Sequence, residues 1–182
     1  MLDSTDRLPL EAPVIQPVTV LCTGNICRSP MAWGLLCADP ELVRLGIGIE
    51  SAGLMAEAGS PPVTQAVCAL AERGLDIRMH RARQATYAGL REAELILVME
   101  KWQKRWIGER WPELAGRVFL LGHWDGFEIA DPYGSRIEVF RATLTEIERG
   151  TRAWVSHLVR MHRPANRVDD RGAIPRDGSE AS

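Results

Sequence analysis

One stretch near the start of the chain, Val18 to Pro30, combines a strand, a tight loop and the start of a helix. Its first four residues, Val18 to Leu21, form an apolar run that is typical of a buried parallel strand. Ser29 and Pro30 are residue types that favour the N-cap and the first position of a helix. A loop between a strand and a helix N-terminus turns backbone N–H groups inward and adds the helix dipole. This stretch therefore predicts an anion-binding site.

Three further apolar runs predict strands at residues 47–51, 95–99 and 118–121. Between and after the strands we expect helices at 29–38, 62–73, 85–93 and 100–111, and a long helix from Ser135 onward. Asp39 and Pro40 are expected to end the first helix. Because strands alternate with helices, we predict an α/β fold with a central four-stranded parallel sheet and helices on both faces. Ligands of such sheets bind at the carboxyl ends of the strands, where the loop after Leu21 lies.

The pattern also divides the chain into a single domain and two tails. Residues 17–162 carry all the predicted strands and helices, so we expect them to form the domain. Residues 1–16 are polar and contain prolines, which predicts a flexible leader. Residues 163–182 are polar and predict a disordered C-terminal tail.

The composition excludes several classes of protein. The 182 residues have a formal net charge of -2, which does not favour nucleic acid or an anionic membrane as a partner. No apolar run approaches the ~18 residues that span a bilayer, so we expect no membrane insertion. The four cysteines fit no zinc-ligand spacing, and the leader has no apolar signal-peptide core. We expect a cytoplasmic protein without a metal or other cofactor, either a monomer or a weak dimer.

Cys22 and Arg28 lie six positions apart within the predicted loop. This spacing alone is common, and the bland interpretation is a buried thiol beside a surface cation. The preceding strand, the glycine in the loop and the Ser-Pro pair favour a functional site instead. Backbone N–H groups and a forked guanidinium match phosphoryl oxygens, and the cation and helix N-terminus favour a thiolate. We therefore predict that Cys22 attacks phosphorus.

A thiolate that attacks a phosphate ester needs an acid to protonate the leaving oxygen. Asp131 is the best candidate, because it lies in the long loop after the fourth strand and Pro132 restrains the backbone beside it. Asp125 is the rival in the same loop, where the sequence His-Trp-Asp-Gly favours a turn.

Separated motifs resemble the low-molecular-weight protein tyrosine phosphatases over about residues 17–160. These motifs are VTVLCTGNICRSPM at Val18–Met31, Ser51-Ala52-Gly53, His80–Gln84 and Asp131-Pro132-Tyr133. The resemblance implies that family's fold and hydrolysis of phosphotyrosine. Residues 97–101 and 121–125 most resemble the bacterial branch linked to capsule and exopolysaccharide export. The implied partner is a phosphotyrosine protein, such as a bacterial tyrosine autokinase.

The resemblance also implies roles for individual residues. Cys22 would become phosphocysteine, Arg28 would bind the phosphate and stabilise the transition state, and Asp131 would protonate the tyrosyl oxygen and then activate water. Ser29 would hydrogen-bond the Cys22 thiolate. The rest of the phosphate-binding loop would be Thr23, Gly24, Asn25, Ile26 and Cys27.

The resemblance also implies that three residues stabilise the phosphate-binding loop, one within it and two outside it. Asn25 is expected in a left-handed conformation, which asparagine tolerates. Ser51 and His80 are expected to brace the loop as hydrogen-bonding neighbours.

Other residues bear on the substrate. A related branch that hydrolyses phosphoarginine has threonine at the place of Ile26, so the resemblance favours phosphotyrosine. Tyr133 is expected to form one aromatic wall of the pocket, and Leu54 and Met55 are candidates for the other wall. Trp33 stands where the family usually has glutamate, and we expect it to pack.

Two other functions are weighed as alternatives. An arsenate reductase of the same fold would need further cysteines near the loop after the second helix, and residues 80–93 contain none. A catalytically silent phosphate-binding module would have lost the nucleophile, the arginine or the acid, and all three are present.

The remaining cysteines and two tryptophans allow more than one interpretation. Cys27 either forms a reversible disulfide with Cys22 or packs under the loop. Cys37 and Cys68 are expected to be small core residues. A third pair, Trp102 and Trp106, forms either a partner surface or part of the core.

Overall fold

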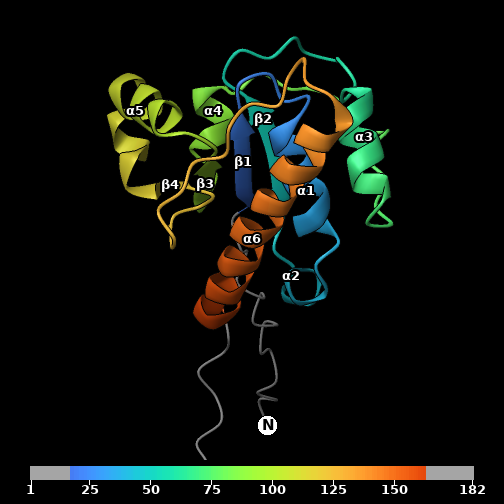
Figure 1. The fold of residues 1–182 in the computed structure, drawn as a ribbon. Helices are drawn as coiled ribbons and strands as arrows, with labels where there is room; N and C mark the ends of the chain where they lie inside the picture. Colours follow the sequence, from blue (N-terminus) through green and yellow to red (C-terminus); the bar gives the residue numbers. More distant parts are fainter. Residues whose placement is uncertain (1–16, 163–182) are drawn as a thin grey trace, which may run out of the picture.

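The computed structural model describes residues 17–162, so the predicted leader and tail lie outside the described residues. Its sheet has four parallel strands in the order β2-β1-β3-β4 (Figure 1). The strands are β1 (Val18–Cys22), β2 (Ile49–Gly53), β3 (Leu95–Val98) and β4 (Val118–Leu120). The helices are α1 (Arg28–Cys37), α2 (Pro40–Leu45), α3 (Thr64–Ala71), α4 (Tyr87–Leu90), α5 (Lys101–Arg110), the 3₁₀ helix η1 (Pro112–Arg117) and α6 (Ile137–His162). The predicted α/β class with a four-stranded parallel sheet is confirmed.

Helices cover both faces of the sheet. Helices α1, α2, α3 and α6 pack together on one face, and α4, α5 and η1 lie on the other side (Figure 1). The alternation of side chains along β3 explains the two layers. Leu95 and Leu97 pack in the core between the sheet and helices α1 and α6, whereas Ile96 and Val98 pack in the core on the other face, under α5 (the α5 core). All four side chains are buried, as a central parallel strand requires.

Helix α6 is the longest helix among the described residues, and it fixes the chain that follows β4 (Figure 1). The Trp154 indole N–H donates to the carbonyls of Leu120 and Leu121 at 3.2 and 3.1 Å. A Cβ atom at Gly150 would lie 2.8 Å from the Leu121 carbonyl oxygen, so only glycine lets the helix approach this closely. The loop after β4, which carries Asp131, therefore starts from a fixed point.

Several boundaries differ from the sequence-based expectation. Asp39 and Pro40 do end the first helix, but they also begin α2, because the Asp39 carboxylate accepts from the N–H groups of Glu41 and Leu42. Strand β2 begins two residues later than expected, where it pairs with β1. The helix expected at 85–93 is confined to the four residues of α4.

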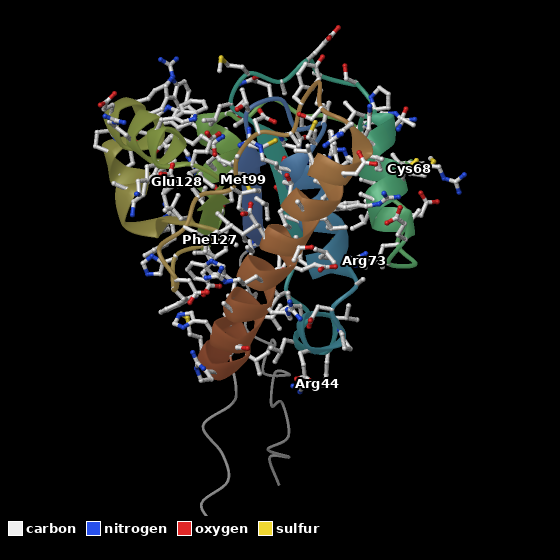
Figure 2. The ribbon with its side chains drawn as sticks, in the orientation of Figure 1. Arg44, Cys68, Arg73, Met99, Phe127 and Glu128 are labelled. Atoms are coloured by element: carbon white, nitrogen blue, oxygen red, sulfur yellow. The ribbon has the colours of Figure 1, made fainter. Side chains whose placement is uncertain are left out.

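The prediction that Cys37 and Cys68 are core residues is wrong, because both are exposed. Figure 2 shows Cys68 on the side of α3 that faces away from α6. Within residues 17–162, no helix combines the length and the apolar character that a bilayer crossing requires.

Candidate active site

The loop after β1 forms a small pocket at the carboxyl end of the sheet. The pocket has a volume of about 200 Å³ and is lined by Cys22, Thr23, Gly24, Ile26, Cys27, Asp131 and Tyr133. Every one of these residues was predicted to belong to the site. The fold thus brings Asp131 and Tyr133, more than 100 positions further along the chain, against the loop that begins at Cys22.

The thiol of Cys22 is surrounded by hydrogen-bond donors. Its Sγ lies 3.2 Å from the backbone nitrogen of Asn25 and 3.0 Å from the hydroxyl oxygen of Ser29. The Asn25 amide nitrogen donates to this same Ser29 oxygen at 2.9 Å, which leaves the Ser29 hydrogen free to point at the sulfur. Hydrogen bonds donated to a sulfur favour its anionic form. The loop therefore places two donors, the Asn25 N–H and the Ser29 hydroxyl, against the Cys22 sulfur.

Cys27, the other thiol in the pocket, lies in surroundings that disfavour the thiolate. It is 3% exposed, and burial, followed by the charges of Cys22 and Asp131, raises its pKa to about 12. Cys27 is accordingly a protonated, weakly nucleophilic thiol at neutral pH. Neither cysteine is in a disulfide. Of the two thiols, Cys22 is the one suited to attack phosphorus.

Asn25 lies inside the loop and holds its shape. It is fully buried and has a φ of 57°, the left-handed conformation that its residue type predicts. The backbone N–H of Arg83 donates to its Oδ1 at 2.8 Å, which fixes the orientation of the amide. Its Nδ2 then donates to the hydroxyl oxygens of Ser29 and of Ser51, the latter at 3.1 Å. One side chain thus ties the loop to β2 and to the segment around Arg83.

The same network determines the state of His80. Ser51 accepts from Asn25, and its oxygen also lies 2.8 Å from Nε2 of His80. Burial, assisted by the positive charges of Arg83 and Arg81, lowers the pKa of His80 to about 4. His80 is therefore a neutral ring at pH 7. It lies beside Trp33, with 5.4 Å between ring centroids, and Trp33 packs as expected.

This low pKa predicts a loss of stability in mild acid. In the unfolded chain His80 has an ordinary pKa near 6.5, so the unfolded state takes up the proton first as the pH falls. The free energy of unfolding should therefore fall between pH 6.5 and pH 4, by about 3 kcal/mol. Urea unfolding at a series of pH values would measure it. In His80→Gln this part of the pH dependence should disappear, whereas the exposed His123→Gln should retain it; equal curves for all three proteins would contradict the prediction.

Arg28 is a buried cation whose guanidinium is held on three sides. It is 1% exposed, and its Nη1 donates to the Glu100 carboxylate at 2.6 Å and to the Ile129 carbonyl at 2.9 Å. Its Nη2 lies 2.5 Å from the Asp131 carboxylate. Its Nε has no hydrogen-bond partner among residues 17–162, although it is buried. This N–H is free to donate a hydrogen bond to a phosphate oxygen.

The sequence analysis did not identify Glu100 or Gln103, although both position the site. Glu100 follows β3 directly and forms the ion pair with Arg28. Gln103 is fully buried and accepts from the N–H groups of Met99 and Glu100 at 2.8 and 3.2 Å. An acidic residue immediately after a buried strand, at the same sheet edge as Cys22, was the available signal.

The loop that carries Asp131 is anchored along its length. Ile129 donates its N–H to the Met99 carbonyl at 2.9 Å, and the Glu128 carboxylate accepts from the N–H of Lys101 at 2.7 Å. Figure 2 labels Met99 and Glu128, which mark the two sides of this contact. Asp131 itself accepts from the N–H of Tyr133 at 3.2 Å. These contacts aim the carboxylate at the pocket.

Asp125, the rival acid, lies elsewhere. Its carboxylate forms an exposed ion pair with Arg149 of α6 at 2.7 Å, and it does not line the pocket. The next residue, Gly126, has a φ of 71°, as the expected turn requires. Asp131 is therefore the acid that the fold places beside Cys22.

The two candidates for the far wall separate in the structure. Leu54 is 3% exposed and packs with Leu21 and Ala52 in the α5 core, so its expected role as a wall is wrong. Met55, the next residue in the turn after β2, is 65% exposed instead. The Met55 N–H donates to the Thr23 carbonyl at 2.9 Å, so its backbone adjoins the loop.

A second unpredicted contact fixes the backbone around Met55. The side-chain amide of Gln84 accepts from the N–H of Ala56 and donates to the carbonyl of Leu54, both at 2.9 Å. The residues on each side of Met55 are thus held by one side chain. Gln84 belongs to a motif that the sequence analysis singled out, but a contact of this kind joins segments that the sequence does not show to be neighbours.

The fold and the site together define the class of cysteine-dependent phosphatases. Residues 17–163 match the family described as low molecular weight phosphotyrosine protein phosphatase. The chain belongs to this family, which confirms the resemblance found in the sequence.

Individual relatives support the same assignment. The chain is similar to the probable low molecular weight protein-tyrosine-phosphatase EpsP of Ralstonia nicotianae, with 43% identity over 145 residues that cover 80% of this chain and 97% of that protein. It is 43% identical over 143 residues to the low molecular weight protein-tyrosine-phosphatase Wzb of Escherichia coli K12, covering 78% and 94%. The structure of the YwlE arginine phosphatase from Geobacillus stearothermophilus matches with a TM-score of 0.73 and 34% identity, covering 80% and 94%. The fold therefore serves phosphatases with different substrates.

Proposed function

We propose that this protein hydrolyses phosphotyrosine through a phosphocysteine intermediate. The observation that carries the proposal is that the Cys22 thiol, which contacts two hydrogen-bond donors, and the Asp131 carboxylate line one pocket, with the buried Arg28 paired to that carboxylate. Cys22 and Arg28 come from one loop, whereas Asp131 lies more than 100 positions further along the chain. A surface with a merely structural role has no need for this arrangement.

The proposed first step transfers the phosphoryl group to sulfur. The Cys22 thiolate attacks phosphorus in line with the tyrosyl oxygen, and the bond between phosphorus and that oxygen breaks. Arg28 and the loop N–H groups bind the equatorial oxygens as charge develops on them. Asp131 gives its proton to the departing tyrosyl oxygen. The products of this step are tyrosine and phosphocysteine.

The proposed second step regenerates the enzyme. Asp131, now a carboxylate, takes a proton from water as that water attacks phosphorus, and inorganic phosphate leaves. The Ser29 hydroxyl, 3.0 Å from the sulfur, stabilises the departing thiolate. Asn25 holds Ser29 in this position through the bond at 2.9 Å.

Two pocket residues support tyrosine as the substrate class. Ile26 lines the pocket with an apolar side chain, where a phosphoarginine branch of the family has threonine. Tyr133 also lines the pocket and is 67% exposed, so its ring is available to stack against a substrate ring. The planar cation of phosphoarginine would gain less from these apolar contacts than an aromatic ring would.

Peptides that carry phosphotyrosine, phosphoserine and phosphoarginine provide the test of this specificity. We expect kcat/KM for phosphotyrosine to exceed the other two by at least about 30-fold, because a missing or mismatched apolar contact costs about 1–3 kcal/mol and two such contacts are involved. Ile26→Thr should narrow the gap between phosphotyrosine and phosphoarginine. A measured preference of the unaltered protein for phosphoarginine would overturn the assignment of tyrosine and leave the phosphocysteine chemistry intact.

We further propose that the substrate is a cytoplasmic bacterial tyrosine autokinase of exopolysaccharide export. The support is the resemblance of residues 97–101 and 121–125 to that branch of the family. Loss of phosphotyrosine from a purified autokinase on mixing with this protein, and not with its Cys22→Ser variant, would be the expected result.

A further inference from the structure

A second cavity, separate from the catalytic pocket, lies at the opposite end of the sheet. Its volume of about 400 Å³ is twice that of the catalytic pocket. It is bounded by residues just before and at the start of β3, by the chain entering and leaving β4, and by the last turns of α6. Figure 1 shows this end of α6 (red) far from the loop after β1. Cavities of this size accommodate small organic molecules.

Five ring side chains line the cavity. Phe119, His123, Trp124, Trp154 and His157 all line it. Trp154 is fixed by its two hydrogen bonds and is 3% exposed, so it forms a rigid floor. Trp124 lies 5.4 Å from Trp154 between ring centroids, yet it is 48% exposed. Indole rings in such an arrangement present flat apolar faces to a planar guest.

The polar groups of the cavity indicate the charge of that guest. The rings of His123 and His157 make no hydrogen bond within the described part of the chain, so their nitrogens are free to donate or accept. The two charged lining residues have opposite signs and are already engaged. Glu94 contacts His162 at 3.2 Å, and Arg117 donates to the carbonyls of Arg91 and Ala93 at 2.9 and 2.7 Å. These features match a neutral molecule rather than an ion.

We propose that this cavity is a binding site for a neutral bicyclic heteroaromatic molecule. The bicycle would lie against Trp154 and Trp124, and a ring N–H or ring nitrogen would pair with His123 or His157. This proposal does not depend on the phosphatase chemistry, because no residue that lines the cavity also lines the catalytic pocket.

Benzimidazole is a suitable probe, since it is flat and bicyclic and has both a ring N–H and an acceptor nitrogen. We would titrate it into the full-length protein and follow the indole N–H signals of the tryptophans by NMR. Saturable shifts are expected for Trp124 and Trp154 and not for Trp106 of α5, which packs with Trp111 and lines no part of the cavity.

Gly116→Leu gives a sharper test by filling the cavity. Gly116 lines the cavity, a Cβ atom there would meet nothing within 4 Å, and its φ is not in the left-handed region. The variant should bind benzimidazole at least tenfold more weakly. Trp124→Ala, which removes an exposed ring, should also weaken binding at least tenfold, whereas Trp106→Ala should bind as the unaltered protein does. Shifts that do not saturate, or unchanged affinity in both cavity variants, would overturn the proposal.

Discussion

Replacing Cys22 with serine should abolish turnover of an aryl phosphate, lowering kcat by at least about 10⁴-fold. The reason lies in the neighbours of the sulfur, the Asn25 N–H and the Ser29 hydroxyl, which both donate to it. Donors stabilise a thiolate, but a serine hydroxyl needs a base to remove its proton, and none of the described residues offers one within hydrogen-bonding distance. Release of phosphate from an aryl phosphate under saturating conditions measures the loss.

The same variant should still bind a phosphotyrosine peptide. Arg28, the loop N–H groups and Asp131 are unaltered by the substitution, so calorimetry should detect a stable complex without turnover. Cys68→Ser is the matched control, because Cys68 is an exposed cysteine on α3 and its loss should leave kcat within about twofold. Wild-type turnover by Cys22→Ser would show that the mechanism is wrong.

The sequence predicted those parts of the fold whose cause is local. The buried runs that became β1 and β3 and the apolar stripe of α6 each depend on the period of side chains along one element. Helix α2 was missed because Asp39 and Pro40 end one helix and start another, and the pattern shows only the interruption. Helix propensity indicates only that Gly150 weakens α6, whereas in the structure its lack of a side chain lets α6 contact the Leu121 carbonyl.

The site shows the same division between local and distant causes. Cys22 and Arg28 lie within one loop, and Asp131 follows the strand that ends at the same sheet edge, so the sequence could suggest all three. Glu100 contacts Arg28 across 72 positions; its place directly after a buried strand indicates the sheet edge at which it lies but not its partner. Leu54 was misassigned because the sequence does not show which side chain of the turn after β2 enters the core.

Asp131→Asn should lower kcat for phosphotyrosine by about 10²- to 10⁴-fold. Asparagine has a similar size and can keep the bond from the Tyr133 N–H, but it cannot give a proton to the tyrosyl oxygen. The loss should depend on the leaving group. An aryl phosphate whose phenol is strongly acidic leaves without protonation, so the variant should lose at least tenfold less activity on that substrate. Steady-state rates on the two substrates measure the difference.

Asp125→Asn is the control for this experiment, because Asp125 belongs to the same loop but pairs with Arg149 outside the pocket. Its kcat should stay within about twofold of the unaltered protein, since the ion pair is exposed and contributes little. With the acidic leaving group, Asp131→Asn should also accumulate phosphocysteine, because the second step needs the carboxylate as a base. Equal losses on both substrates would show that Asp131 is not the general acid. Its function would then be to orient Arg28 through their contact at 2.5 Å.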